Sequence, residues 1–376
     1  MLAPPPHHPE GRLTSALPSD QVGAAARDDG GARVVRTRFR AHDHSLTSRS
    51  LDQAVVAADQ LGRGLALMGR GRDRRPDVVV ATAPALPTIG AGLALGRALR
   101  RPVVVEMRDA WPDLLAPADV MRTRATGAGL CRLAAGAAVT GLTRAQRSAD
   151  HVVTTTDSFA RVLAGRGISA SAIGNGVSDD LLPVFHPPPL DRARLRVLYL
   201  GTTGRSQHLS TALEAAARAR ALGVDVALRI VGSGSDQPRL RALARNLALD
   251  VELTGRVPRT AVGTHYAWAD TAVVMLRDWP PFRWTVPSKL YEILAVGRHV
   301  SASVDGEAAD LVRASRGGHV VPPQDPAALA DLWARLAADR RLLDVGGRPR
   351  AWVLEHAHHD LLARRYLALL ETVVAG

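Results

Sequence analysis

The chain has 376 residues, 46% of them apolar, which is enough for two α/β domains that each bury their own core. Its one cysteine excludes an intrachain disulfide, a cysteine-rich zinc site and a CxxC redox centre. The formal net charge of +12 comes almost entirely from arginine in a chain also rich in Ala and Gly. This favours a solvated basic surface over a patch that attracts phosphorylated donors or an anionic membrane, and nucleic-acid binding comes third. Only four Tyr and four Phe are present, and no basic-aromatic run offers bases a stacking platform.

Membrane insertion and export are disfavoured as well. The longest apolar run, 85–99, is interrupted by Pro, Gly and Arg and falls short of the roughly 20 residues that span a bilayer. Residues 1–20 lack the basic start and apolar centre of a signal peptide. Together with the single cysteine, these features predict a cytoplasmic protein with at most peripheral membrane contact.

The first half of the chain is expected to form one α/β domain. Residues 1–45 are rich in Pro, Gly, His and charge, and only 32–39 alternates as a strand does, so this segment is expected to be irregular. Further on, apolar patterning predicts strands at 77–81, 102–107 and 152–155 and a helix at 89–99. This order predicts parallel strands with right-handed crossovers.

A second α/β domain is expected after a proline-rich linker at 182–194. The predicted strands lie at 196–200, 227–231, 250–253 and 271–276, and the predicted helices at 209–221, 238–247 and 260–268. Such alternation is typical of a doubly wound sheet. Apolar residues at helical spacing in 360–374 predict a C-terminal amphipathic helix.

The predicted fold class is therefore α/β, with two Rossmann-like doubly wound domains facing a cleft. The expected boundaries are 1–185 for the N-terminal domain and 186–356 for the C-terminal domain. The remaining helix, 357–376, is expected to pack back towards the N-terminal domain.

The most informative window is 276–311, which contains Lys289, the only lysine in the chain. Thr285 or Val286 is expected to cap a helix that has Pro287 in its first turn. The start of this helix follows a strand of a parallel sheet, and its free N–H groups suit a phosphate. Lys289 could add a point charge there, and Glu292 could accept two hydrogen bonds from a ribose diol. The alternative is an exposed i,i+3 ion pair between these two residues, which contributes about 0.2–0.5 kcal/mol.

A resemblance to family 4 glycosyltransferases rests on the segment VPSKLYEILAVGRHVSASVDGEAADL, which begins at Val286. Further matches are YLGTTGRSQHL from Tyr199, IVGSG from Ile230, LTGRVP from Leu253 and VVVEMRDAWP from Val103. Family 4 enzymes are two-domain (GT-B) retaining glycosyltransferases, and the branch that these motifs resemble often moves amino sugars from UDP. The resemblance implies a nucleotide-sugar site in the C-terminal domain and an acceptor site in the N-terminal domain.

Position by position, the resemblance implies roles for individual residues. The residues implied to bind the donor are Gly201, Thr203, Gly204, Arg205, Arg256, Val257, Pro287, Ser288, Lys289, Leu290 and Glu292. The residues implied to take part in catalysis are Arg108, Asp109 and Lys289. For Asp109 the alternative is a helix or turn cap, and Asn175-Gly176-Val177 is more simply an ordinary turn.

The implied reaction is transfer of a hexose or N-acetylhexosamine from a UDP-sugar to a hydroxyl group, with retention and without a metal or other cofactor. The implied acceptor is a lipid-linked saccharide or a small natural-product scaffold. Two rival functions on the same architecture are a UDP-sugar epimerase and a catalytically silent binding partner. An NAD oxidoreductase is disfavoured, because neither half has a GxGxxG after its first strand with an acidic residue about 20 positions on.

The sequence departs from the family pattern at several places. Trp284 occupies the first of two positions, eight residues apart, that are commonly glutamate, and Thr202 and Gln207 stand where Arg and Lys are frequent. The segment PPHHPEGRLT, from Pro5, resembles one that usually follows a second strand. The first strand, glycine-rich turn and helix are therefore expected to be absent, either because the sequence starts late or because the N-terminal sheet is incomplete.

Overall fold

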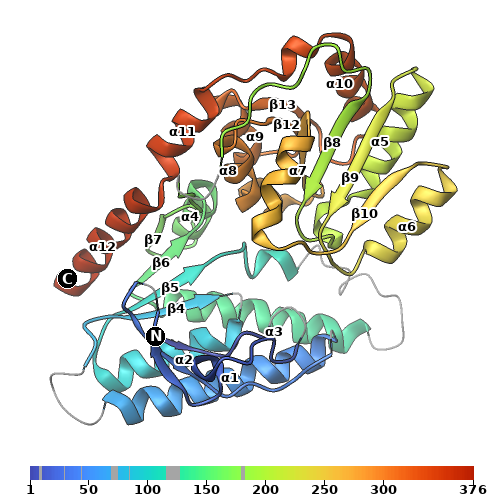
Figure 1. Ribbon diagram of the computed structural model, residues 1–376. Coiled ribbons are helices and arrows are strands. Elements are labelled where there is room, and N and C mark those ends of the chain that lie inside the picture. The colour runs from blue at the N-terminus through green and yellow to red at the C-terminus, as the bar shows by residue number, and fades with distance from the viewer. Residues whose placement is uncertain are drawn as a thin grey trace. The chain divides into compact units, whose positions relative to one another are not determined.

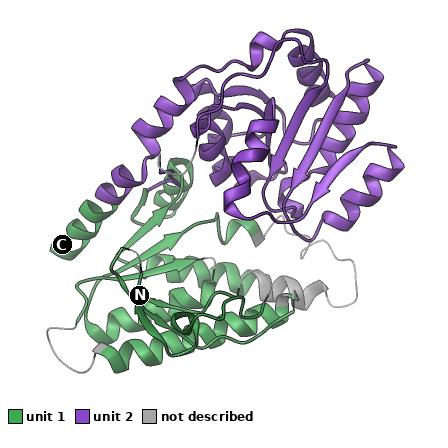
Figure 2. Cartoon of the chain, in the orientation of Figure 1, with its two compact units in different colours: residues 1–172, 366–376 green, residues 173–365 purple. Residues whose placement is uncertain are grey.

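The computed structural model describes residues 1–7, 11–28, 30–43, 45–68, 75–83, 85–115, 128–178 and 183–376. They form two compact units, unit 1 with residues 1–172 and 366–376 and unit 2 with residues 173–365 (Figure 2). The boundary after residue 172 precedes the expected one at 185, and the return to unit 1 at 366 follows the expected one at 357. Part of the PPHHPEGRLT segment, 8–10, and the first residue of the expected linker lie outside the described residues.

Unit 1 is built on a parallel sheet in the order β4-β5-β6-β7 (Figure 1). Its strands are β4 (Val79–Ala83), β5 (Val103–Met107), β6 (His151–Thr154) and β7 (Ala170–Ala172). Its helices are α1 (Leu46–Met68), α2 (Leu86–Leu99), α3 (Ala128–Arg147) and α4 (Asp157–Ala164). Helix α2 lies directly on β4, since a Cβ at Gly92 would be 2.6 Å from the Cβ of Ala81. Helix α1 packs on α2.

The expectation of an irregular 1–45 is wrong in part. Three short strands, β1 (Leu2–Ala3), β2 (Ala25–Arg27) and β3 (Arg33–Arg36), form a second sheet with β3 in the centre. Strand β3 lies within the alternating stretch, and both Val34 and Val35 are buried. Burial of these two side chains stabilises strands too short for sequence periodicity to reveal.

Unit 2 contains a six-stranded parallel sheet in the order β10-β9-β8-β11-β12-β13. The strands are β8 (Leu195–Leu200), β9 (Val226–Val231), β10 (Val251–Thr254), β11 (Thr271–Met275), β12 (His299–Ser303) and β13 (Gly318–Val321). The strand order reverses between β8 and β11. In doubly wound sheets, ligands bind at the carboxyl ends of strands beside such a reversal.

Helices cover both faces of this sheet (Figure 1). Helix α5 (Ser210–Ala221) packs against α6 (Gln237–Asn246) and α10 (Pro326–Ala338). Across the sheet lie α7 (Val262–Trp268), α8 (Ser288–Ala295) and α9 (Glu307–Ser315), and α11 (Arg348–Ala357) packs on α8 and α9. Helix α12 (His359–Ala375) begins in unit 2 and ends in unit 1.

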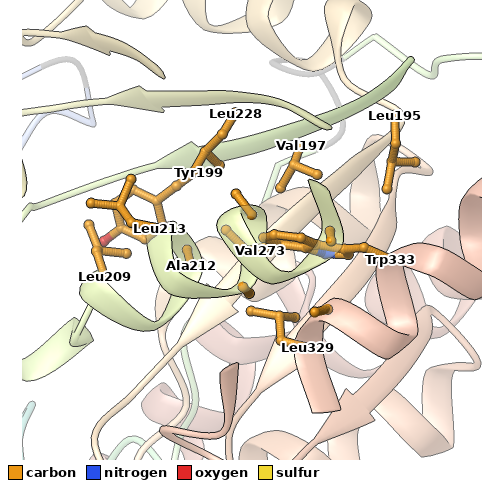
Figure 3. Close-up of a cluster of buried hydrophobic side chains, with 14 of the residues drawn as sticks. Leu195, Val197, Tyr199, Leu209, Ala212, Leu213, Leu228, Val273, Leu329 and Trp333 are labelled. Carbon is orange, nitrogen blue, oxygen red and sulfur yellow. The ribbon is translucent and has the colours of Figure 1, made fainter. Parts of the chain in front are cut away.

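The core of unit 2 lies between the sheet and the helices α5, α6 and α10. Its fully buried side chains include Leu195 and Val197 of β8, Leu213 of α5 and Trp333 of α10. Trp333 extends towards Val273 of β11 (Figure 3). Unit 2 therefore buries its own apolar core, as an independent Rossmann-like domain must.

None of the helices within the described ranges is long and apolar enough to cross a bilayer.

Candidate functional site

The turns after β8 and β9 interlock at the carboxyl edge of the sheet in unit 2. The Gly201 N–H donates to the Val231 carbonyl at 2.9 Å, and the Thr203 N–H donates to the Ser233 carbonyl at 3.1 Å. A Cβ at Gly232 would lie 1.8 Å from the Gly201 carbonyl oxygen, and its φ of 141° is one that side chains disfavour. The two turns therefore form one rigid backbone rim.

The expected phosphate loop, 201–205, belongs to this rim. Thr203 is fully buried, and its hydroxyl has no hydrogen-bond partner among the described residues. The Gly204 N–H donates to the side-chain oxygen of Gln207 at 3.1 Å. Arg205 starts a short 3₁₀ turn and is exposed. The buried Thr203 thus packs the loop against the domain, whereas the exposed Arg205 is the residue whose charge can reach a bound anion.

Helix α8 begins near the same edge, after β11. Pro287 has extended backbone angles and is the N-cap, so the expectation that Thr285 or Val286 caps the helix is wrong. Ser288 is exposed, and Leu290 is fully buried. Leu290 therefore anchors the helix in the core, and its N–H donates to the Pro287 carbonyl at 2.9 Å. The N–H groups of Ser288 and Lys289, in the first turn of α8, are the ones that suit an anion.

Lys289 and Glu292 of α8 form an ion pair with a buried anchor. Lys289 Nζ donates to Glu292 Oε1 at 3.0 Å and to Oε2 at 3.1 Å, and the Tyr266 hydroxyl donates to Oε1 at 2.7 Å. The Lys289 side chain is 38% exposed and that of Glu292 is 18% exposed. Burial, and then the Glu292 carboxylate, raises the pKa of Tyr266 well above its usual value, so the hydroxyl keeps its proton. The i,i+3 pair exists, and Tyr266 fixes the carboxylate beneath it.

Two more arginines follow strands at this edge. Arg256, after β10, is exposed beside the half-buried Val257. Arg277, after β11, is not singled out by sequence reasoning, although its position after a central strand is a signal for it. Its N–H donates to the Ser206 carbonyl at 2.9 Å, and its guanidinium carbon lies 5.0 Å from the Trp279 ring centroid. Its Nε is buried without a hydrogen-bond partner among the described residues.

In unit 1, the turn after β5 carries Arg108 and Asp109. Arg108 donates to Glu106 at 3.0 Å, and Thr82 donates to the other oxygen of Glu106 at 2.8 Å. Burial raises the pKa of Asp109, with Arg108 acting in the opposite direction. No hydrogen bond to the Asp109 carboxylate is found within the described ranges, so a turn cap does not account for it. Burial, and then Glu106, raises the pKa of Tyr366 to about 12.

The turn of Asn175, Gly176 and Val177 has a packing role. The Val177 N–H donates to the Ala357 carbonyl at 3.0 Å. A Cβ at Gly176 would lie 2.6 Å from that same oxygen, so only glycine permits this approach. These contacts agree with an ordinary turn.

Two family models match the chain, one over each half. A glycosyl transferase 4-like domain matches residues 9–176, and glycosyl transferases group 1 matches residues 194–339. The chain belongs to the family 4-type glycosyltransferases. This confirms the family that the motifs in 103–112, 199–209 and 286–311 resemble, which is a family of transferase enzymes.

Curated relatives match this chain over part of its length. It is 31% identical over 192 residues to WcaL of Salmonella typhimurium, a protein assigned to colanic acid biosynthesis as a glycosyltransferase, covering 48% of the chain and 45% of WcaL. WcaL of Escherichia coli is 28% identical over 199 residues, covering 50% and 48%. The chain thus spans about half the length of the curated relatives that it matches.

Solved structures share the fold of this chain over nearly its whole length. Sucrose-phosphate synthase from Thermosynechococcus elongatus has a TM-score of 0.70 at 18% identity, covering 95% of this chain and 87% of its own. Anabaena HepE in complex with UDP-glucose has a TM-score of 0.65 at 15% identity, covering 90% and 86%. The predicted α/β class with two Rossmann-like domains is confirmed.

Proposed function

We propose that this glycosyltransferase moves a hexose or N-acetylhexosamine from a UDP-sugar to a hydroxyl group with retention of anomeric configuration. The observation that carries the proposal is the group formed by Lys289, Glu292 and Tyr266 at the start of α8. It lies after β11, one of the strands beside the reversal of the sheet, where a doubly wound domain binds its ligand. UDP as the nucleotide is supported by the structures of HepE with UDP and with UDP-glucose.

Glu292 would exchange partners when the donor binds. Its carboxylate accepts two hydrogen bonds from Lys289 and one from Tyr266. The two hydroxyls of a ribose can replace the two bonds from Lys289, while Tyr266 keeps the carboxylate oriented. Lys289, which is 38% exposed, is then free to swing towards the diphosphate.

The same residues would stabilise the leaving group. As the bond to the sugar breaks, negative charge develops on the phosphate, and fixed donors aimed at that charge lower the barrier. Lys289, the exposed Arg205 and the N-terminus of α8 supply positive potential at this edge of the sheet. Arg277, whose main-chain N–H donates to the carbonyl of Ser206 beside the phosphate loop, adds a cation that the sequence motifs do not indicate. Transfer without a divalent metal is therefore part of the proposal.

On the acceptor side, the proposal assigns Arg108 and Asp109 of unit 1 to the transferred sugar or the acceptor hydroxyl. Burial raises the pKa of Asp109, and its carboxylate accepts no hydrogen bond from other described residues, so it can bind an incoming hydroxyl. The acceptor would be a lipid-linked saccharide or a small scaffold, reached at the cytoplasmic face of a membrane. The assignment of WcaL to colanic acid biosynthesis favours a saccharide.

Calorimetric titration of the purified chain with UDP and UDP-sugars, in EDTA and in Mg²⁺, tests the donor assignment. We expect UDP to bind equally well in both buffers and an added acceptor to consume UDP-sugar. Conversion of UDP-sugar to an epimer without acceptor would instead indicate the epimerase. Nucleotide binding without turnover on any acceptor would indicate a silent partner. Absence of nucleotide binding by a folded chain would refute the donor site.

A further inference from the structure

Three ionisable side chains from distant parts of the sequence converge in unit 1. His7 follows β1, His42 lies between β3 and α1, and Asp52 is on α1. The three side chains are 10%, 4% and 6% exposed, respectively. His7 Nε2 lies 3.1 Å and His42 Nε2 lies 3.9 Å from Asp52 Oδ2, and the three ligand atoms all lie within 4.8 Å of one another.

The hydrogen bonds of the two imidazoles indicate where their protons are. His7 Nδ1 lies 2.8 Å from the Pro5 carbonyl oxygen, and His42 Nδ1 lies 2.7 Å from the Asp43 carbonyl oxygen. A carbonyl oxygen only accepts, so each Nδ1 carries the proton. In a neutral imidazole the lone pair is then on Nε2. In that neutral form both lone pairs face the Asp52 carboxylate, and either a proton on an Nε2 or a metal ion between the groups removes the repulsion.

The remaining carboxylate oxygen is fixed in the same way. Asp52 Oδ1 accepts a hydrogen bond from the Arg40 N–H at 2.8 Å, which leaves Oδ2 for the histidines. Each of the three side chains thus has one atom held by the backbone and the other aimed at a common point. Backbone partners that orient ligands in this way are the usual second layer around a protein-bound metal.

We propose that His7, His42 and Asp52 form a binding site for a divalent transition metal of the zinc type. Metal–ligand distances of about 2.0–2.2 Å place tetrahedral ligand atoms about 3.4 Å apart. The observed separations of 3.1 Å and 3.9 Å bracket that value. Two imidazoles and one carboxylate suit Zn²⁺ better than Mg²⁺ or Ca²⁺, which prefer oxygen ligands.

The backbone around the site brings the ligands together. The Gly11 N–H donates to the His7 carbonyl at 2.7 Å, and the His42 N–H donates to the Gly11 carbonyl at 2.8 Å. Gly11 has a φ of 71°, and a Cβ there would lie 2.0 Å from the His42 carbonyl oxygen. A metal bound by these ligands would join the N-terminal sheet to α1. The chain has only one cysteine and so cannot form an intrachain disulfide. A bound metal would instead supply a cross-link that stabilises the N-terminal segment.

Zinc binding by the tag-free protein tests the proposal, because the chain has 13 histidines and surface sites must be discounted. Chelator-stripped protein is titrated with ZnCl₂ against a competing chelator, and bound metal is counted by mass spectrometry. We expect one tight site per chain and a loss of affinity of at least about 100-fold in Asp52→Asn and in His42→Gln. Asp52→Asn retains an oxygen to accept from the Arg40 N–H, so the local fold is kept.

Asp59→Asn is the matched control. Asp59 is also on α1 and accepts a hydrogen bond from the backbone N–H of Arg38 at 2.8 Å, but it faces Arg63 instead of histidines. We expect this variant to bind zinc as the unaltered chain does. Equal zinc affinity in Asp52→Asn, or no tight site in the unaltered chain, would overturn the proposal and leave a histidine–aspartate ion pair.

Cobalt spectroscopy uses the unaltered chain, so its result does not depend on whether the variants fold. Co²⁺ bound at the proposed site should show the intense visible bands of a four-coordinate ion, and one equivalent of Zn²⁺ should abolish them. Weak six-coordinate bands, or bands that zinc does not displace, would contradict the site.

Discussion

Replacing Lys289 by methionine is expected to weaken UDP binding while leaving the fold intact. Methionine keeps most of the apolar stem of the side chain and removes the ammonium group with its charge and its N–H donors. In the absence of nucleotide, Lys289 bonds to both oxygens of Glu292. Its loss there costs about 0.2–0.5 kcal/mol of stability, because the pair is a partly exposed i,i+3 pair.

The effect on affinity follows from the exchange of partners. A hydrogen bond between a charged amine and a phosphate contributes about 1.5–3 kcal/mol. Lys289 must first break its ion pair with Glu292, which costs about 0.2–0.5 kcal/mol, and this cost is subtracted. The net loss of about 1–2.8 kcal/mol corresponds to a roughly 5- to 100-fold higher Kd for UDP. Because the Lys289 side chain is 38% exposed, the expected loss of binding free energy for UDP is smaller than for a fully buried charge pair.

Arg313→Met is the matched control in calorimetric titrations of both variants with UDP. Arg313 forms an i,i+3 pair with Asp310 at 3.0 Å on α9 of the same unit, and both side chains are more than half exposed. We expect its UDP affinity to equal that of the unaltered chain. A Kd within twofold in Lys289→Met would refute the role of Lys289 at the phosphates and would make the pair a surface feature.

Three further results are expected. Gly232→Ala should lower the free energy of unfolding in urea by at least about 2 kcal/mol, because its Cβ would lie 1.8 Å from the Gly201 oxygen; a variant of normal stability would show that the two turns yield. Tyr266→Phe loses the 2.7 Å bond to Glu292 and should lower the free energy of unfolding by about 1.5–3 kcal/mol together with UDP affinity; unchanged affinity would contradict the orienting role. Burial lowers the pKa of His299 from 6.5 to about 3, so the unfolded chain takes up a proton that the native chain excludes. The free energy of unfolding should therefore fall as pH drops from 6.5 towards 3, by up to about 1.4 kcal/mol per pH unit from this group, and a His299→Gln variant that shows the same slope would exclude His299 as its source.

The alternation of strands and helices in unit 2 could be predicted because its strands are nearly continuous apolar runs. The run predicted at 196–200 is the buried β8, and that at 271–276 is β11, all of whose residues are buried. Parallel strands covered on both faces have this pattern, which sequence reasoning detects well. The register of the strands and the helix caps depend on contacts that the pattern does not contain.

Helix α1 and the N-terminal sheet could not be predicted in this way. The buried positions of α1 include Val56 and Ala57 but also Asp52, so its apolar stripe is narrow and contains a charge. Asp52 is buried because it meets His7 and His42, which lie 45 and 10 residues away in sequence. Such spacing follows no zinc-site pattern, and only the fold brings the three together.

The candidate donor site was predictable in outline and not in detail. The solitary Lys289 and its spacing from Glu292 single out α8, the helix to which we assign the donor, yet the buried Tyr266 that holds Glu292 comes from another helix, α7. Thr203 and Leu290 belong to the matched motifs, but both are fully buried and act as supports. Arg277 belongs to none of the matched motifs; its place after a central strand is a general signal, whereas its contact with Ser206, beside the expected phosphate loop, depends on the fold.

A crystal structure of the chain soaked with UDP tests the donor site most directly. We expect the ribose hydroxyls on the Glu292 carboxylate, the Tyr266 bond retained, and Lys289 turned from Glu292 towards the phosphates at the start of α8. Nucleotide bound elsewhere on the chain, or bound here with the pair between Lys289 and Glu292 unbroken, would contradict the proposed exchange.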